Sequence, residues 1–288
     1  MYHLHPLYRA PLHFNSNYNS RRPQLITSDY YLFQSEQPSV QVLDPPHRQL
    51  VILDLNGTLV SRSNSGMYVR PYQDMFLDYL FKWFDVMVWS SAQPHSVANM
   101  CRLFGSRQPV CIWDRRCFML SGSQYHGKFP TIKNLEAVWW AFGQGTKYEA
   151  HNTILIDDSS HKTMMQPYNA IHISTFDHRD KRLIHKGDKE LIHVMEYLEK
   201  LRSQSNVSNY IRHHPYKSSS STTTTDHPHE HQVYFYDFTT GQRQLVDLRS
   251  HVSFQKSIPP LPPSSPSSSL PIAIETSSSN SLSIMQTL

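Results

Sequence analysis

Five short, mainly apolar runs, separated by stretches with helical spacing, do most to limit what this chain can fold into. The runs occupy 50–53, 86–89, 110–113, 153–156 and 170–173. Runs of this length between turn residues are typical of strands buried on both faces of a parallel sheet. Apolar residues recur at helical spacing in the intervening stretches, at 71–84, 94–103, 131–142 and 188–202. The alternation predicts an α/β fold, with a Rossmann-like parallel sheet, helices on both of its faces and right-handed crossovers.

Composition places this fold in the middle of the chain. Asp44-Pro45-Pro46 marks its start, because two prolines cannot enter a helix or a central strand. From about Lys217 onward Ser, Thr, Pro and His dominate, and such sequence buries too little apolar surface to offset the entropy lost on ordering. We therefore expect a mostly disordered tail at 1–46, one folded domain at 47–202 and a low-complexity tail at 203–288. An apolar island at 233–248 predicts a hairpin or a short docking segment within that tail.

Charge and cysteine content argue against several classes of protein. The formal net charge is only +4, without a concentrated block of Lys or Arg, so the sequence gives no strong signal for nucleic-acid binding. The three cysteines show no C-x-x-C spacing, which argues against zinc or a disulfide framework and favours a reducing, intracellular compartment. No apolar run approaches the roughly 18 residues that a transmembrane segment needs.

The N-terminal residues carry basic groups and no acidic group before Asp29, which is a weak feature of mitochondrial transit peptides. Pro6, Pro11 and Pro23 break the amphipathic helix that such a peptide requires. A disordered tail is therefore the preferred interpretation, with a mitochondrial location as the alternative.

Polar residues follow the predicted strands at the edge where parallel sheets bind ligands. Asp54 follows the first strand, Ser90 the second, and Asp157-Asp158 the fourth, while Lys133 lies in the predicted helix at 131–142. Each has an ordinary explanation as a turn, a cap or a solvated helix face. Two adjacent carboxylates, however, repel each other unless a cation joins them. Together these groups suit aspartate-based phosphoryl transfer, in which a carboxylate attacks phosphorus, a hydroxyl and a lysine hold the phosphate, and further carboxylates fix Mg²⁺.

The ordered series of motifs resembles the haloacid dehalogenase superfamily, whose first motif is D-x-D-x-T after the first strand. Within it, the chain is most similar to the NLI-interacting-factor group. That group contains phosphatases of the RNA polymerase II C-terminal domain and the presequence receptor of the mitochondrial inner-membrane translocase. The resemblance covers about half of the chain. The matching stretches are Val51-Ile52-Leu53-Asp54-Leu55-Asn56-Gly57-Thr58-Leu59, Arg70-Pro71, Val86-Met87-Val88-Trp89-Ser90-Ser91, Lys133-Asn134-Leu135 and Ile154-Leu155-Ile156-Asp157-Asp158-Ser159.

The resemblance implies a role for each site residue. Asp54 would be the nucleophile that becomes an aspartyl-phosphate and would also bind the metal. Lys133 would neutralise the nucleophile and hold the phosphoryl group, with the Thr58 and Ser90 hydroxyls beside it. Asp158 would bind Mg²⁺ directly, and Asp157 would bind the ion or hold its waters.

Asn56 departs from the family pattern, which places a second Asp at this position. That Asp protonates the leaving oxygen and later activates water, and an amide can do neither. The main-chain carbonyl of Asn56 would still bind Mg²⁺. Losing a general acid–base costs about 10²–10⁴ in rate.

Three functions therefore remain open. The first is a slow protein serine/threonine phosphatase in the nucleus or cytoplasm, with the RNA polymerase II C-terminal domain as one candidate substrate. The second is a pseudophosphatase that binds a phosphorylated or basic peptide. The third is a homologue of the translocase receptor, with translocase subunits or presequences as partners.

Overall fold

The chain is described here from a computed structural model that covers residues 27–43, 47–143, 145, 147–218 and 231–250. Of the tails predicted at 1–46 and 203–288, residues 1–26, 44–46, 219–230 and 251–288 lie outside the described residues.

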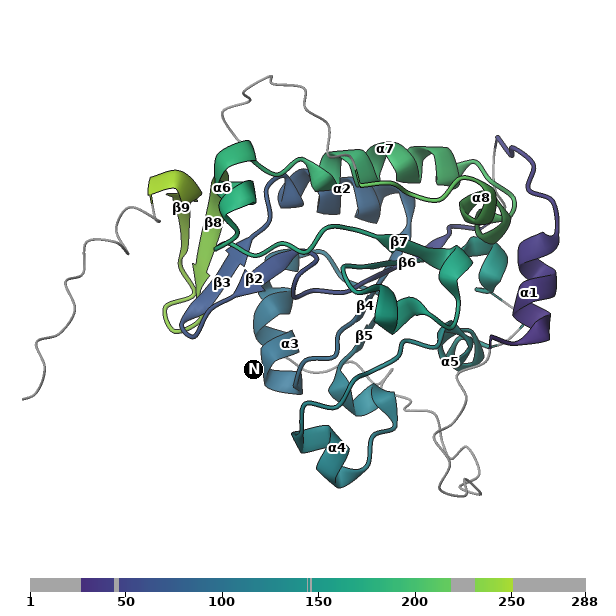
Figure 1. The fold of residues 1–288 in the computed structure, drawn as a ribbon, viewed down its shortest axis with the longest axis horizontal. Coiled ribbons are helices and arrows are strands. Elements are labelled where there is room, and N and C mark those ends of the chain that lie inside the picture. Colours follow the sequence, from purple (N-terminus) through teal and green to yellow (C-terminus); the bar gives the residue numbers. More distant parts are fainter. Residues whose placement is uncertain (1–26, 44–46, 144, 146, 219–230, 251–288) are drawn as a thin grey trace, which may run out of the picture.

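A five-stranded parallel sheet forms the centre of the molecule (Figure 1). Its strand order is β5-β4-β1-β6-β7, and every neighbouring pair is parallel. The strands are β1 (Leu50–Leu53), β4 (Asp85–Trp89), β5 (Cys111–Trp113), β6 (Thr153–Asp157) and β7 (Ala170–His172). Each of the five apolar runs forms one of these strands, so the predicted fold class is confirmed.

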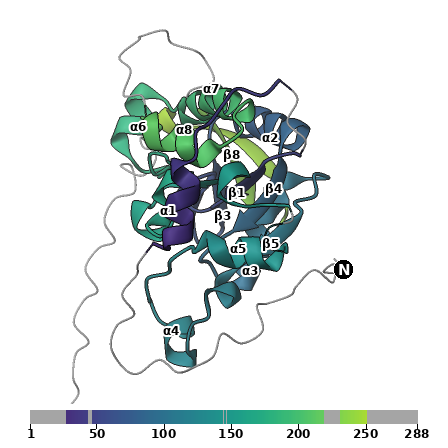
Figure 2. The same cartoon turned by 90° about the vertical axis from the view of Figure 1, so that its right-hand side faces the viewer.

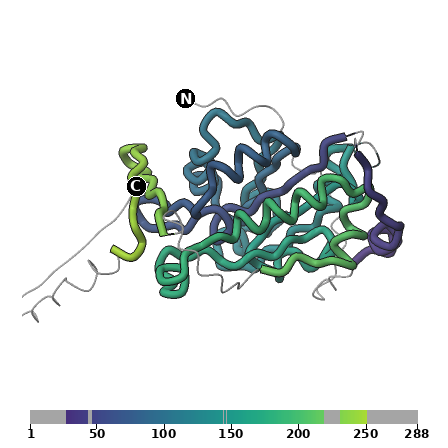
Figure 3. Tube along the Cα trace, turned by 90° about the horizontal axis from the view of Figure 1, so that it is seen from above, coloured from purple at the N-terminus to yellow at the C-terminus, as the bar shows by residue number. Residues whose placement is uncertain are grey.

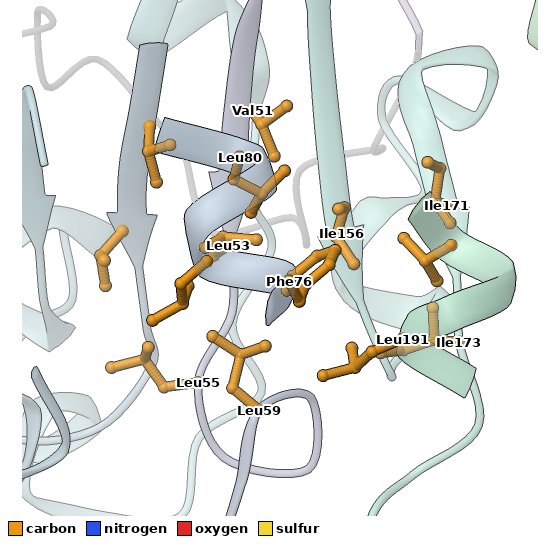
Figure 4. Close-up of a cluster of buried hydrophobic side chains, with 14 of the residues drawn as sticks. Val51, Leu53, Leu55, Leu59, Phe76, Leu80, Ile156, Ile171, Ile173 and Leu191 are labelled. Carbon is orange, nitrogen blue, oxygen red and sulfur yellow. The ribbon is translucent and has the colours of Figure 1, made fainter. Parts of the chain in front are cut away.

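Alternate residues of the strands pack into two separate cores, one on each face of the sheet. On one face, Val51 and Leu53 meet helices α2 (Gln73–Trp83) and α7 (Glu190–Arg202), as Figure 4 shows. On the other, Leu50 and Ile52 pack with side chains of α5 (Leu135–Ala141) and with Tyr31 of α1 (Asp29–Glu36). Helices therefore cover both faces, as the sequence predicted.

The helix expected at 131–142 starts later than predicted. It is α5, which begins at Leu135 because the Asn134 side chain accepts the Glu136 N–H at 3.1 Å. The N–H of Lys133 is already donated to the carbonyl of Lys162, at 2.7 Å. Lys133 therefore lies in the segment before the helix, and the prediction that it is a helical residue is wrong.

A second, antiparallel sheet joins two segments that are far apart in the sequence. Its order is β2-β3-β8-β9, so the hairpin that follows Asp54 is extended by a hairpin from the predicted tail (Figures 1 and 3). Tyr68, Val233 and Leu248 pack with Phe176 and with Ile184 in a small core of their own. The strands are β2 (Val60–Arg62), β3 (Gly66–Val69), β8 (Gln232–Asp237) and β9 (Arg243–Asp247).

The folded unit includes residues on both sides of the 47–202 range. Helix α1 contacts α8 (Val207–His213), as Figure 2 shows, and Gln41 forms an isolated β-bridge with Gln204. Tyr31 of α1 is fully buried because its ring packs near Trp139 and Tyr168. Among the described residues, no helix is both long and apolar enough to cross a membrane. The remaining helices are α3 (Pro94–Met100), α4 (Gly122–His126) and α6 (Lys181–Lys186), with single 3₁₀ turns at Cys101–Phe104, Arg115–Phe118, Ala150–Asn152, Ser160–Thr163 and Pro167–Asn169.

Candidate active site

Three carboxylates meet where the central strands β1 and β6 end. The strands are paired with Leu53 opposite Ile156, and the Asp54 N–H continues the ladder by donating to the Ile156 carbonyl at 3.0 Å. The parallel register therefore places Asp54 beside the end of β6, whose last residue is Asp157 and which Asp158 follows. One oxygen from each carboxylate lies within 4.8 Å of the other two. Carboxylate oxygens at this spacing fit a hard divalent cation such as Mg²⁺.

A tight turn after Asp54 fixes how close these groups come. The Gly57 N–H donates to the Val60 carbonyl at 2.8 Å, and the Leu59 N–H donates to the Leu55 carbonyl at 2.8 Å. Gly57 has φ +90°, a conformation that favours glycine. A Cβ at this position would lie only 2.3 Å from Asp158 Oδ2. Only glycine allows the turn to pass so close to the third carboxylate.

Lys133 is completely buried and joins two of the carboxylates. Its Nζ donates to Asp54 Oδ1 at 2.9 Å and to Asp157 Oδ2 at 2.5 Å. A buried ammonium needs such partners, because its desolvation is otherwise too costly. Lys133 thus fixes one oxygen of Asp54 and leaves Oδ2 on the other side of the carboxylate.

A second lysine, which the sequence reasoning missed, lies at the same site. Lys162, on the 3₁₀ turn after β6, places its Nζ 3.6 Å from Asp54 Oδ2, 3.4 Å from Asp157 Oδ1 and 3.9 Å from Asp158 Oδ1. Its four-residue spacing from Asp158 was the available sequence signal, since such spacing joins opposite charges on one turn of a helix.

Burial and neighbouring charges shift the pKa values of the three carboxyl groups, two of them upward and one downward. Burial raises the pKa of Asp54, and the charge of Asp157 adds to this, although the two lysines oppose it. For Asp157 burial also raises the pKa, but the charges of Lys133 and Lys162 outweigh it and the pKa is lowered. Burial, followed by the charge of Asp54, raises the pKa of Asp158. A divalent cation bound here would favour the ionised form of all three.

Asn56 is exposed and its side chain is engaged by a neighbouring residue. Its Oδ1 accepts hydrogen bonds from the Arg62 backbone N–H at 3.3 Å and from Arg62 Nε at 3.1 Å. The Asn56 side chain therefore accepts hydrogen bonds from a cationic residue, Arg62. An amide in this arrangement has no proton to transfer at neutral pH.

The two predicted phosphate-binding hydroxyls differ in their surroundings. Thr58 is fully buried, and its hydroxyl has no hydrogen-bond partner within the described part of the chain. Ser90 follows β4, the other neighbour of β1, and its Oγ accepts the Ala92 N–H at 3.3 Å. Ser90 therefore lies at the same edge of the sheet as Asp54. Its hydroxyl also stabilises a turn, which is the ordinary structural role that the sequence analysis offered as an alternative to phosphate binding.

Other residues missed by the sequence reasoning hold the loops of the site. Arg70 is buried against Asp188 at 2.9 Å, and it also donates to the Thr58 carbonyl at 3.1 Å. The Thr175 hydroxyl donates to Asp158 Oδ2 at 2.9 Å, and the Phe176 N–H donates to the Gly57 carbonyl at 2.7 Å. The segment after β7 therefore supports both the Asp158 carboxylate and the turn.

Comparison with known families places this site in context. The sequence pattern of the NLI interacting factor-like phosphatases matches residues 49–208, which is more than half of the chain. The chain belongs to this family. The resemblance found from the motifs is thereby confirmed, and the matched range contains all of the site residues described above.

Two curated relatives show how far the similarity extends. A Schizosaccharomyces pombe protein described as containing an FCP1 homology domain is 38% identical over 192 residues, covering 59% of this chain and 78% of the relative. The human ubiquitin-like domain-containing CTD phosphatase 1 is 26% identical over 172 residues, covering 56% of this chain and 53% of the relative. The match thus spans only about half of that CTD phosphatase.

Among solved structures, the chain is similar to Fcp1, an essential RNA polymerase II CTD phosphatase. The match has a TM-score of 0.36 and 12% identity, and it covers 62% of this chain and 58% of that protein.

Proposed function

We propose that this chain is a slow, Mg²⁺-dependent protein serine/threonine phosphatase that acts through an aspartyl-phosphate on Asp54. The observation that carries the proposal is the Asp54 carboxylate, buried at the end of β1 with one oxygen held by Lys133. A nucleophile fixed in this way is held in one orientation toward an incoming phosphoryl group.

Each protein group has a definite task in this reaction. One oxygen of the Asp54 carboxylate forms a bond to phosphorus as the bond from phosphorus to the Ser or Thr oxygen breaks. Lys133 neutralises Asp54 and helps to hold the phosphate, together with the hydroxyls of Thr58 and Ser90. Bound through Asp54, Asp158 and the Asn56 carbonyl, with Asp157 binding it or its waters, Mg²⁺ would offset the charge of the transferring phosphoryl group.

Asn56 makes both chemical steps slow. The departing Ser or Thr oxygen needs a proton, and the water that cleaves the aspartyl-phosphate must lose one. Asn56 can neither give nor take that proton, because it is an amide and its Oδ1 is already hydrogen-bonded to Arg62. In both steps the proton is therefore exchanged with solvent water. This observation favours one alternative, a pseudophosphatase that binds phosphorylated peptides without turnover.

The relatives support the substrate class that we propose. Because the named relatives include CTD phosphatases, we propose a phosphorylated Ser/Thr segment as the ligand, with the RNA polymerase II C-terminal domain as a candidate. The nucleus or cytoplasm is the compartment that we propose, as expected from the reduced state that the cysteine content predicts. The translocase-receptor alternative has no support from the relatives reported above.

Replacing Asn56 by Asp tests the proposal. With Mg²⁺ present, Asn56→Asp should raise hydrolysis of an aryl phosphate at least about tenfold, because it restores the general acid–base. The gain should be larger for a phosphoserine peptide, whose more basic leaving oxygen depends more on a proton. Steady-state release of phosphate measures both rates.

Asn64→Asp makes the same chemical change at an exposed position in the turn between β2 and β3, and should leave both rates unchanged. Asp54→Asn should abolish activity. If Asn56→Asp has no effect while Asp54→Asn abolishes hydrolysis, the proposed role of position 56 is wrong. Failure of the protein to bind Mg²⁺ would favour the pseudophosphatase instead.

A further inference from the structure

Lys162 occupies a particular place among the three carboxylates. Lys133 Nζ donates hydrogen bonds to Asp54 Oδ1 and Asp157 Oδ2, and the Thr175 hydroxyl donates one to Asp158 Oδ2. The Nζ of Lys162 lies 3.4–3.9 Å from the other oxygen of each carboxylate. It therefore faces the oxygens that a metal ion would need.

The two lysines are held very differently. The Lys133 side chain is fully buried, with contacts of 2.9 and 2.5 Å, both within hydrogen-bonding distance. The Lys162 side chain is 18% exposed, and its contacts are too long for strong hydrogen bonds. A flexible four-carbon stem that reaches solvent allows the Lys162 ammonium to leave the carboxylates without unfolding the site.

We propose that Lys162 is a built-in counter-cation that competes with Mg²⁺ for the three carboxylates. With both lysines in place, three carboxylates face two ammonium groups, so the site is nearly neutral before a metal binds. A divalent ion that uses the same oxygens meets the positive charge of Lys162 within a few ångströms. Lys162 must then move toward solvent, and Mg²⁺ binds more weakly than it would to the carboxylates and Lys133 alone.

This inference deepens the proposed function, because it rests on the same acidic site as the place where Mg²⁺ binds. It makes the site dependent on a high Mg²⁺ concentration and keeps the carboxylates together when the ion is absent. Asn56 has no part in it, since the side chain of Asn56 contacts Arg62 rather than Lys162.

Calorimetric titration of the full chain with Mg²⁺ tests the competition. Lys162→Met removes the charge and keeps a similar stem, and it should tighten Mg²⁺ binding at least about tenfold, since unit charges about 4 Å apart repel by more than that factor in Kd. Lys162→Arg keeps the charge and should bind Mg²⁺ within a few-fold of the wild type. Lys162→Gln serves as a second neutral variant if the Met form folds poorly.

Lys200→Met is the matched control for the change in net charge. Lys200 is exposed near the end of α7, next to Leu201, whose carbonyl accepts a hydrogen bond from Gln49 at the start of β1. It therefore lies at the opposite edge of the sheet, and its replacement should leave Mg²⁺ affinity unchanged. Thermal unfolding gives a second readout, in which Mg²⁺ should raise the Tm of Lys162→Met more than that of the wild type.

Equal Mg²⁺ affinity in Lys162→Met and Lys200→Met would overturn the inference, as would weaker binding or no binding in every form. Weaker binding of inorganic phosphate to Lys162→Met, with unchanged Mg²⁺ affinity, would make Lys162 a phosphate ligand and would also overturn it. The proposed function and this inference can be refuted independently of each other. Tighter Mg²⁺ binding without hydrolysis would support the competition and argue against the phosphatase, whereas Mg²⁺-dependent hydrolysis with no change in affinity would do the opposite.

Discussion

Replacing Lys133 by Met should strongly destabilise the fold, because it leaves two buried carboxylates without their closest cation. Asp54 and Asp157 are almost completely buried and both accept hydrogen bonds from Lys133 Nζ. Removing one partner of such a buried group costs about 3–5 kcal/mol. Lys162 stays within 3.6 Å of Asp54 and 3.4 Å of Asp157, which places the expected loss at the lower end, about 3 kcal/mol.

The pH dependence of this loss has a definite sign. In the wild type the lysine charges lower the pKa of Asp157 despite its burial, so its ionised form adds stability above the unfolded pKa of about 4. Without Lys133, burial dominates: the folded pKa of Asp157 rises above the unfolded value, and that of Asp54, already raised in the wild type, rises further. The variant therefore shows the full loss of free energy of unfolding at neutral pH, where both buried carboxyl groups are ionised. The loss becomes smaller as the pH falls through their raised pKa values and they become protonated. The difference between wild type and variant should narrow from pH 7 to pH 5.

Urea denaturation at pH 7 and pH 5, with a chelator present to remove divalent ions, measures this difference. The double variant Lys133→Met with Asp157→Asn should recover part of the lost free energy of unfolding, because it removes one of the uncompensated charges. A loss below about 1 kcal/mol at pH 7, the value usual for an exposed ion pair, would refute the argument. So would a loss that is equal at the two pH values.

Two further predictions concern the turn and the N-terminal helix. Gly57→Ala should cost about 1–3 kcal/mol and weaken Mg²⁺ binding in calorimetry, because its Cβ would displace Asp158. Gly241→Ala is the control, because Gly241 also has a positive φ but a Cβ there would meet nothing within 4 Å. If both variants lose the same free energy of unfolding and Mg²⁺ binding is unchanged, the clash with Asp158 is unimportant. Tyr31→Ala should cost about 3–5 kcal/mol in urea denaturation, because Tyr31 is fully buried. Tyr30→Ala, at a residue 51% exposed, should cost less than about 1 kcal/mol, and similar losses would show that α1 does not belong to the core.

The central sheet could be predicted because its signal is local. A strand buried on both faces must be apolar along its length, and Leu50–Leu53 is such a run with its limits as predicted. The ends of parallel strands meet at one edge, so the convergence of Asp54 with Asp157 and Asp158 also followed from the sequence.

The second sheet depends on contacts that no local pattern records. Strands β2 and β3 have only 3 and 4 residues, and the sequence analysis predicted neither of them. Gly66 pairs with Asp237, far along the chain, and a Cβ at Gly66 would lie 2.2 Å from the Tyr236 carbonyl oxygen. Pairing across such a separation is decided by tertiary packing rather than by propensity.

The site residues show the same division between local and tertiary signals. Thr131 and Asn134 are both suitable helix caps, and the hydrogen bond from the Lys133 N–H to the Lys162 carbonyl decides in favour of Asn134. That single bond brings the backbones of the two lysine residues together. It explains why the helix boundary was misplaced and why Lys162 was missed, since both depend on how the turn after β6 packs against the segment before α5.

Asn56 and Lys162 affect separate quantities, because they engage different atoms of the site. In the reaction that we propose, Asn56 concerns a proton at the leaving oxygen or at water, so it would limit the rate after the metal has bound. Lys162 concerns the oxygens that hold the metal, so it sets how much Mg²⁺ is needed to fill the site. A low rate that does not recover at saturating Mg²⁺ is therefore attributable to Asn56, and one that recovers is attributable to Lys162. The dependence of the rate on Mg²⁺ concentration thus distinguishes two cases. In one, the missing acid–base slows the phosphatase, and in the other, Lys162 weakens the binding of the metal.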